Sequence, residues 1–170
     1  MRICSLLPGA TEIAYLLGLG DQIVGVTHEC DYPPDAKYKP VVVRSIIDPN
    51  RMSGQQIDAK VAELLQAGKG LYTIDVRMFL EAAPDVVLTQ GLCDVCALDY
   101  AEVAKAARLL PRLPEIASPN PHSLAHVLGD FLRVARATVR ASIALPLIHR
   151  LRERIDRVGA GEPKYRPRVL

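Results

Sequence analysis

The fold of this 170-residue chain is decided by the stretch Pro84-Asp85-Val86-Val87-Leu88-Thr89-Gln90-Gly91-Leu92-Cys93-Asp94-Val95-Cys96. A short apolar run that is rich in β-branched residues and bounded by proline and glycine is typical of a strand buried on both faces of a sheet. In open parallel sheets, ligands bind beyond the carboxyl ends of the strands. We therefore expect residues 90–96, which directly follow this strand, to lie at the functional edge of the sheet.

Further strands and helices alternate along the chain with short connections. Ser53-Gly54-Gln55-Gln56 has the form of a capping box, and Asp75 is placed to cap the next helix. Pro8-Gly9-Ala10-Thr11-Glu12 is expected to be a turn into a helix that runs through Leu19 and is stopped by Gly18 and Gly20. The alternation predicts an α/β protein with a mostly parallel sheet flanked by helices. Strands are expected at residues 2–7, 22–27, 40–43, 71–74, 85–90 and 113–116, and helices at 12–19, 54–68, 76–83 and 98–110.

The last third of the chain predicts one long helix. Pro121 is a favourable first helical residue, and Pro146 should kink the helix or shift its phase. Over about 37 residues, or about 55 Å, apolar side chains recur at helical spacing: Leu124, Leu128, Phe131, Ala135 and Val139, then Leu147, Leu151, Ile155 and Val158. The sequence thus predicts an α/β lobe over residues 1–120, a long helix over 121–158, and a tail over 159–170.

Composition indicates a folded protein, because 49% of the residues are hydrophobic and 24% are charged. The net charge of +2 is too small to indicate nucleic acid as a partner. No stretch approaches the length of a membrane span, and Met1-Arg2 leads into the first strand without a signal peptide. As written, the chain is expected in the cytoplasm, or in the periplasm or outside the cell if it is a trimmed form.

Cys93 and Cys96 allow three interpretations. They could form a redox dithiol at the start of a helix, or half of a metal site completed by His28 and Cys30 at the end of a neighbouring strand. The third and favoured interpretation is a structural loop or a local disulfide. Cys4 is most simply a small buried hydrophobic side chain.

No catalytic motif occurs in the sequence. A nucleophile elbow, a phosphate-binding glycine loop and a metalloprotease motif are all absent, so the sequence indicates a protein that is not an enzyme. His28 and Glu29 end a strand, where a ligand contact and a surface-loop role are equally open. His122, His126 and His149 are expected on the surface or in packing contacts.

Four segments follow one another along the chain: Ile3-Cys4-Ser5-Leu6-Leu7-Pro8-Gly9-Ala10-Thr11-Glu12-Ile13, Val24-Gly25-Val26-Thr27, Asp31-Tyr32-Pro33-Pro34 and Pro84-Asp85-Val86-Val87-Leu88. Together they resemble the iron-siderophore and vitamin-B12 class (class III) of substrate-binding proteins of ABC importers, and most of all their cobalamin-binding branch. The resemblance implies two α/β lobes joined by a long helix, with the ligand between them. Residues 1–120 would be the first lobe, 121–158 the joining helix, and 166–170 the first strand of a second lobe.

The resemblance also implies the functional residues. The ligand would be cobalamin-like or an iron or other metal chelate, no further cofactor is implied, and an ABC permease would dock near the surface glutamate Glu102. The His28-Glu29-Cys30 loop allows a metal-bearing ligand held by side-chain coordination. The loops facing the ligand would be Pro8, Gly9, Ala10, His28, Glu29, Cys30, Arg44, Ser45, Gln90, Gly91, Leu92 and Cys93.

Two hypotheses follow. The first is a non-catalytic ligand-binding lobe, which covers only one side of a ligand and is therefore expected to bind weakly alone or to pair with a second chain through the long helix. The second is a small metal- or thiol-dependent protein that uses His28, Cys30, Cys93 and Cys96.

Overall fold

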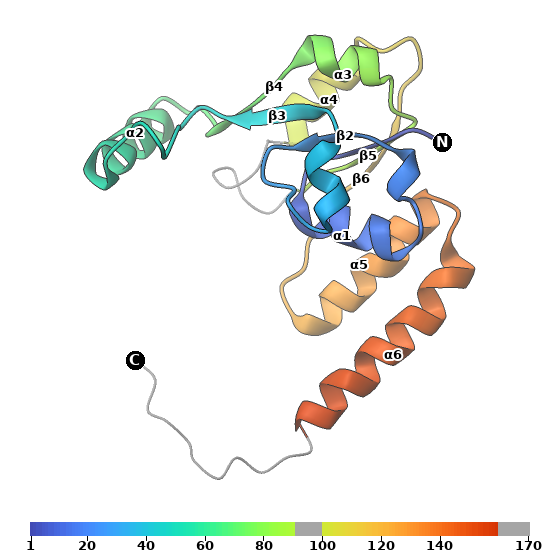
Figure 1. The fold of residues 1–170 in the computed structure, drawn as a ribbon. Coiled ribbons are helices and arrows are strands. Elements are labelled where there is room, and N and C mark those ends of the chain that lie inside the picture. Colours follow the sequence, from blue (N-terminus) through green and yellow to red (C-terminus); the bar gives the residue numbers. More distant parts are fainter. Residues whose placement is uncertain (91–99, 160–170) are drawn as a thin grey trace, which may run out of the picture.

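The computed structural model describes residues 1–90 and 100–159. Within them, a six-stranded sheet has the strand order β4-β3-β2-β1-β5-β6. β1 pairs in parallel with β2 and β5, β2 with β3, and β5 with β6, whereas β4 runs antiparallel to β3. The prediction of an α/β fold with a mostly parallel sheet is confirmed (Figure 1). The strands are β1 (Ile3–Ser5), β2 (Ile23–Thr27), β3 (Val41–Ser45), β4 (Tyr72–Ile74), β5 (Val86–Leu88) and β6 (Glu115–Ala117).

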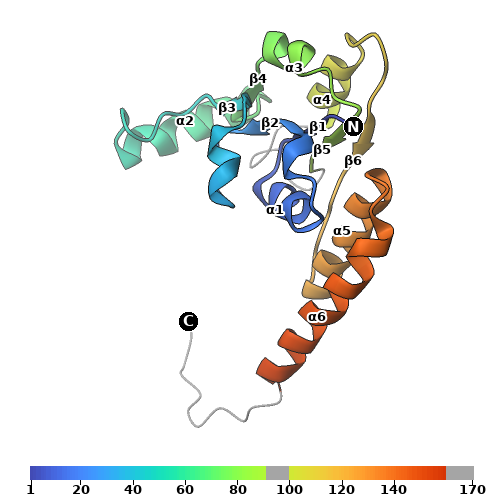
Figure 2. The same ribbon diagram turned by 45° about the vertical axis from the view of Figure 1, so that its right-hand side comes forward.

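The central strands bury side chains on both faces of the sheet. In β5, Val86 and Leu88 belong to the apolar layer shared with α1 (Pro8–Leu16) and α5 (Leu124–Ala137), while Val87 belongs to the opposite layer. The opposite layer includes residues of α3 (Val76–Ala82) and α4 (Tyr100–Ala107). Figure 2 shows these helices above and below the sheet. The expected burial of β5 on both faces is confirmed.

Helix α1 begins earlier than expected. Residues 8–12, predicted as a turn, already belong to the helix, because a proline at the first helical position has no N–H that needs a partner. The helix ends before Gly18, whose φ of 73° is the left-handed conformation that stops helices. Two short 3₁₀ helices, η1 (Gly20–Gln22) and η2 (Pro34–Tyr38), flank β2.

The predicted helix caps are present. Ser53 Oγ accepts a hydrogen bond from the Gln56 N–H at 3.3 Å, and the Ser53 N–H donates to Gln56 Oε1 at 2.8 Å. This capping box opens α2 (Gly54–Gln66), which stands away from the other helices at the β4 end of the sheet (Figure 1). Asp75 caps α3 by accepting from the Met78 N–H at 3.0 Å.

The prediction of a single helix over residues 121–158 is wrong. The segment forms α5 and then α6 (Ala141–Gly159), which pack side by side (Figures 1 and 2). The break lies at residues 138–140 and not at Pro146, which lies inside α6. Thr138 Oγ1 donates to the Val134 carbonyl at 2.7 Å, and Val139 has a φ of 56°, so the backbone leaves the helical path there.

The far half of α6 extends past the sheet (Figure 1). Among the described residues, no helix is both long enough and apolar enough to cross a membrane. The strand predicted at residues 166–170 lies outside the described residues.

Candidate functional site

With the adjoining Leu7 and Thr89, one edge of the sheet, which we call the rim, carries parts of four predicted ligand-binding segments: residues 8–10, 28–29, 44–45 and 90. They follow β1, β2 and β5 and end β3, and these neighbouring strands are parallel. Backbone hydrogen bonds hold the neighbouring chain segments together at the rim. The Leu6 N–H donates to the Leu88 carbonyl at 2.8 Å, and the His28 N–H donates to the Val43 carbonyl at 3.0 Å. The predicted residues Gly91, Leu92, Cys93 and Cys96 lie outside the described residues.

A polar cluster of His28, Glu29 and Tyr72 occupies the end of the rim next to β4. Tyr72 Oη donates to Glu29 Oε1 at 3.0 Å. His28 Nε2 lies 3.9 Å from the same oxygen, and the His28 and Tyr72 rings lie 6.0 Å apart between centroids. The cluster therefore presents a ring nitrogen, a carboxylate and a phenol at a partly exposed surface. Tyr72 was not predicted, because its place beside Ser45 depends on the antiparallel pairing of β4.

Arg44 and Ser45 lie in β3 itself, not in a loop after it. The Arg44 side chain is exposed and carries the cationic group of this part of the rim. Ser45 Oγ accepts a hydrogen bond from the Ile47 N–H at 3.0 Å, so the hydroxyl is engaged in the following turn. Of the two, Arg44 is the better placed to contact an anionic or carbonyl group of a ligand.

Cys30, predicted to join His28, Cys93 and Cys96 in a metal site, is buried; Cys93 and Cys96 lie outside the described residues, so that site stays a prediction. Cys30 is 4% exposed and packs in the core, where its Sγ lies 3.1 Å from Thr11 Oγ1. Burial raises the pKa of the Cys30 thiol, and the hydrogen bond with Thr11 acts in the opposite direction. In the described part of the chain, no group of three His, Cys, Asp or Glu residues could hold a metal ion.

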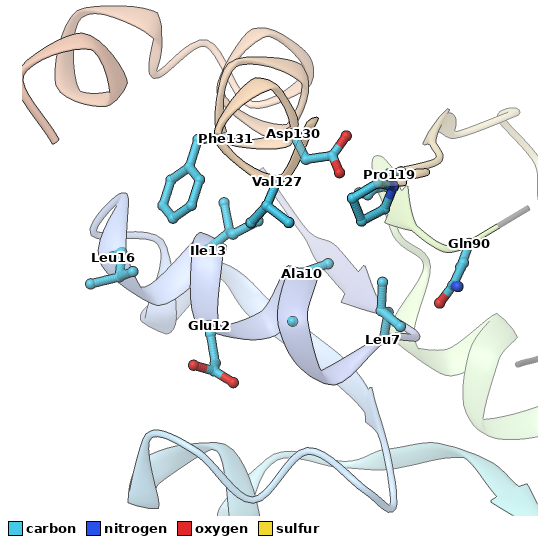
Figure 3. A pocket seen from close by; sticks show the side chains of 12 residues that line it. Leu7, Ala10, Glu12, Ile13, Leu16, Gln90, Pro119, Val127, Asp130 and Phe131 are labelled. Atoms are coloured by element: carbon cyan, nitrogen blue, oxygen red, sulfur yellow. The ribbon is translucent and has the colours of Figure 1, made fainter. Parts of the chain in front are cut away.

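A cavity of about 410 Å³ runs from the rim along the groove between α1 and α5 (Figure 3). The sequence predicted only Gly9, Ala10 and Gln90 of its lining. Ile13 on α1 faces Val127 and Phe131 on α5 across it. Its lining residues are Leu7, Gly9, Ala10, Glu12, Ile13, Leu16, Gln90, Pro119, Pro121, Val127, Asp130 and Phe131.

Asp130 is the buried polar residue of this cavity. It is 4% exposed; its Oδ1 accepts a hydrogen bond from Arg133 Nη1 at 3.0 Å, while Oδ2 has no hydrogen-bond partner within the described structure. Burial raises the pKa of the Asp130 carboxyl, and Arg133, the Asn120 backbone N–H and His126 act against this shift. The sequence contained a signal, because Asp130 lies between Leu128 and Phe131 on the apolar face of its helix.

Glu102, the residue expected to dock a permease, is exposed in the first turn of α4. It lies on the helical layer opposite α1 and α5. The structure thus leaves its side chain accessible and apart from the α1–α5 cavity.

No family model matches the chain. Over 35 residues it is 63% identical to the vitamin B12-binding protein of Vibrio cholerae, a match that covers 21% of this chain and 13% of that protein. Over 36 residues it is 56% identical to YvrC of Bacillus subtilis, an uncharacterized ABC transporter substrate-binding lipoprotein, with 21% of this chain and 12% of that protein covered.

The structural matches cover more of the chain than the sequence matches do. The periplasmic vitamin B12-binding protein BtuF of Vibrio cholerae matches with a TM-score of 0.65 and 23% identity, over 95% of this chain and 52% of that chain. The periplasmic heme-binding protein HutB of Vibrio cholerae matches with a TM-score of 0.67 and 16% identity, over 97% of this chain and 51% of that chain.

These matches define the class by its fold: the chain has the fold of one lobe of a periplasmic substrate-binding protein, and it spans about half the length of these structural neighbours. The predicted resemblance to the iron-siderophore and vitamin-B12 class of ABC-importer binding proteins is confirmed, over the short sequence match and the longer structural one.

Proposed function

We propose that the chain is a ligand-binding lobe that captures a cobalamin-like ligand or a metal chelate for an ABC importer, without catalysing a reaction. The observation that carries the proposal is the 63% identity over 35 residues to a protein named for vitamin B12 binding, on a fold that the two share. A non-catalytic role agrees with the chemistry of the described residues, because the Cys30 thiol is buried in the core.

In this proposal the rim supplies the contacts. Gly9, in the first turn of α1, is exposed and has no side chain, so a flat ligand can approach the backbone there, whereas Ala10 is buried in the core. His28 and Glu29 offer a ring nitrogen and a carboxylate, which suit either the amide groups of a corrinoid or the metal of a chelate. Arg44 offers a guanidinium to a carboxylate or carbonyl group. Ligand sites of this kind combine apolar walls with a few polar groups.

We further propose the domain division expected from the sequence, with residues 1–120 as the binding lobe. The α5–α6 hairpin replaces the single joining helix in this proposal, and α6 is its outer element. Glu102 on α4 would contact the permease. The proposal is supported by the structural neighbours, of which this chain covers about half.

A lobe that contacts one side of a ligand should bind it weakly unless a second surface completes the site. Exposed apolar side chains on α6, among them Ile143 and Leu145, are available for pairing of two chains. Size-exclusion chromatography with light scattering, with and without ligand, tests this. A monomer that binds a corrinoid tightly would contradict it.

The proposed function is tested by absorbance titration of the purified chain with cobalamin, heme and a ferric chelate. His28→Ala and Arg44→Ala should each weaken binding of the preferred ligand by about tenfold, since each removes one charged or strongly polar contact. Arg77→Ala is the matched control, because Arg77 is exposed on α3 and lies outside the rim.

Two results would contradict the proposal. One is that none of the three ligands binds, or that the rim variants bind as the wild type does. The other is stoichiometric zinc or iron in the purified protein that is lost on Cys93→Ser, which would instead support the metal-dependent hypothesis.

A further inference from the structure

We propose that the α1–α5 cavity, which shares Gly9, Ala10 and Gln90 with the rim but not the polar cluster of His28, Glu29 and Tyr72, takes a small cationic amphiphile: an apolar body that carries one ammonium group. This proposal goes beyond the proposed function and does not rest on it. It rests on the shape of the cavity, its apolar walls and a buried carboxylate oxygen without a partner.

The size and walls of the cavity suit a small organic molecule. Its volume of about 410 Å³ falls within the ~300–1,000 Å³ typical of small-molecule sites. Ile13, Val127 and Phe131 form facing apolar walls (Figure 3). Leu16, at the far end of α1, also lines the cavity, yet 54% of this residue is exposed to solvent. An apolar body in the cavity would cover these surfaces and gain their burial.

The buried carboxylate of Asp130 defines the polar end of the ligand. Its Oδ1 is paired with Arg133, but its Oδ2 is buried and makes no hydrogen bond to any described residue. A buried acceptor without a donor is unfavourable, and a charged donor forms the stronger hydrogen bond with a carboxylate. An ammonium group that reaches Oδ2 from the cavity would supply the missing donor, beside the ion pair that Oδ1 makes with Arg133.

The charge of the lining favours a cation over an anion. Glu12 and Asp130 are the ionisable side chains among the lining residues that the structure describes, and both are acidic. Arg133, the nearest cation, lines a different groove on the β6 side of α5, together with Ser118 and Arg136. Asp130 is already ion-paired with Arg133 through Oδ1, but no basic side chain is among the described lining residues, so the lining favours an ammonium ion over an anion.

The test uses three isosteric probes with the full 170-residue chain: 2-naphthylmethylammonium, the neutral 2-naphthylmethanol and the anion 2-naphthoate. Isothermal titration calorimetry measures affinity, and amide chemical shifts in NMR spectra locate the bound probe. We expect the ammonium probe to bind about tenfold or more tightly than the alcohol, the difference typical of a charge-assisted hydrogen bond. We expect the anion to bind most weakly.

A variant and its matched control test whether the probe binds in the α1–α5 cavity. Gly9→Leu should abolish binding by filling the cavity, because a Cβ at Gly9 meets no atom within 4 Å and a leucine is tolerated in a helix. Gly129→Leu is the matched control: a Cβ there is equally free, but Gly129 lines the groove on the other side of α5. Asp130→Asn should remove the preference for the ammonium probe, and Glu12→Gln should reduce it about twofold.

Each possible result either supports or overturns the proposal. Preference for the cation that is lost in Gly9→Leu and kept in Gly129→Leu supports the proposal. Equal affinity for the three probes, unchanged binding in Gly9→Leu, or no binding up to the solubility limit overturns it. If Asp130→Asn does not fold, Gly9→Leu still tests whether the probe binds in the cavity, and Glu12→Gln still tests the preference for the ammonium probe. Binding of the ammonium probe without any binding of cobalamin, heme or ferric chelate would refute the proposed function alone.

Discussion

The two halves of the rim differ in how they are held. Behind the central half, at the ends of β1 and β5, Ser5, Leu88 and Thr89 are at most 1% exposed. In the lateral half, next to β4, the Glu29 side chain is 47% exposed and is held by the hydroxyl of Tyr72. Packing on both faces therefore fixes the central half, whereas surface hydrogen bonds position the lateral half. The central half is suited to a preformed cavity, and the lateral half to side chains that adjust to a ligand.

The largest expected effect concerns the reactivity of the two buried thiols. Burial raises the pKa of Cys4 to about 12 and raises the pKa of Cys30, so near neutral pH neither forms the reactive thiolate. In a Cys93→Ser/Cys96→Ser variant, both thiols should react with a chromogenic disulfide reagent at least about a thousandfold more slowly than in concentrated guanidinium chloride. A thiol that reacts like a free one would show that the central half opens readily.

The next effect tests the packing at the boundary of the two halves. Gly25 in β2 lies so close to its neighbours that a Cβ would stand 2.8 Å from Cys4 Sγ and 2.9 Å from Val42 Cγ1. Gly25→Val should lower the free energy of unfolding by about 1–3 kcal/mol through overpacking, measured by urea denaturation. Gly54→Ala is the control, since a Cβ there meets nothing within 4 Å and this first residue of α2 accepts alanine, so the free energy of unfolding should not fall.

The central half could be predicted from the sequence because its signal is local. The run Val86-Val87-Leu88 is apolar without alternation, which is what burial on both faces requires, and the strands beside it have the same character. Parallel pairing then places their carboxyl ends at one edge. The caps at Ser53 and Asp75 were predictable for the same reason, because each depends on residues within three positions.

The lateral half and the cavity depend on contacts that periodicity does not encode. Tyr72 reaches Glu29 only because β4 reverses direction, and no turn residue marks that reversal as antiparallel pairing with β3. The break between α5 and α6 occurs at Thr138 and Val139 without glycine or proline. Because of this break, α6 turns back and packs on α5; α5 also packs beside α1, and this second contact creates the cavity that Asp130 lines.

A smaller effect concerns Asp130 and pH. Burial raises the pKa of this carboxyl in the folded state, so between the unfolded and folded pKa values the folded chain binds a proton that the unfolded chain does not. Stability from this group is thus present at low pH and falls as pH rises through that interval. As pH falls from neutral, the free energy of unfolding of the wild type should rise relative to Asp130→Asn, by at most ~1.4 kcal/mol per pH unit.

Urea denaturation of both proteins at a series of pH values measures this difference. Titrating groups that do not act on Asp130 contribute equally in both chains and cancel in the comparison, whereas Arg133 and His126, which act on this carboxyl, are part of the measured difference. A difference that shrinks on acidification would mean that the ion pair with Arg133 outweighs burial of the carboxylate. The Asp130–Arg133 ion pair would then stabilise the fold, and the α1–α5 cavity would not favour a further cation.

The smallest effect belongs to the lateral half. Tyr72→Phe removes the hydrogen bond to Glu29 Oε1 at an exposed site, where such bonds contribute about 0.5–1 kcal/mol, so unfolding by urea should shift only slightly. Tyr38→Phe is the control, since Tyr38 is 87% exposed. Tyr72→Phe should change the affinity for the preferred rim ligand more than it changes the free energy of unfolding, because the Glu29 carboxylate is then free to move. If Tyr72→Phe instead destabilised the fold as strongly as Gly25→Val, the lateral half would be as tightly packed as the central one, and the contrast between them would fail.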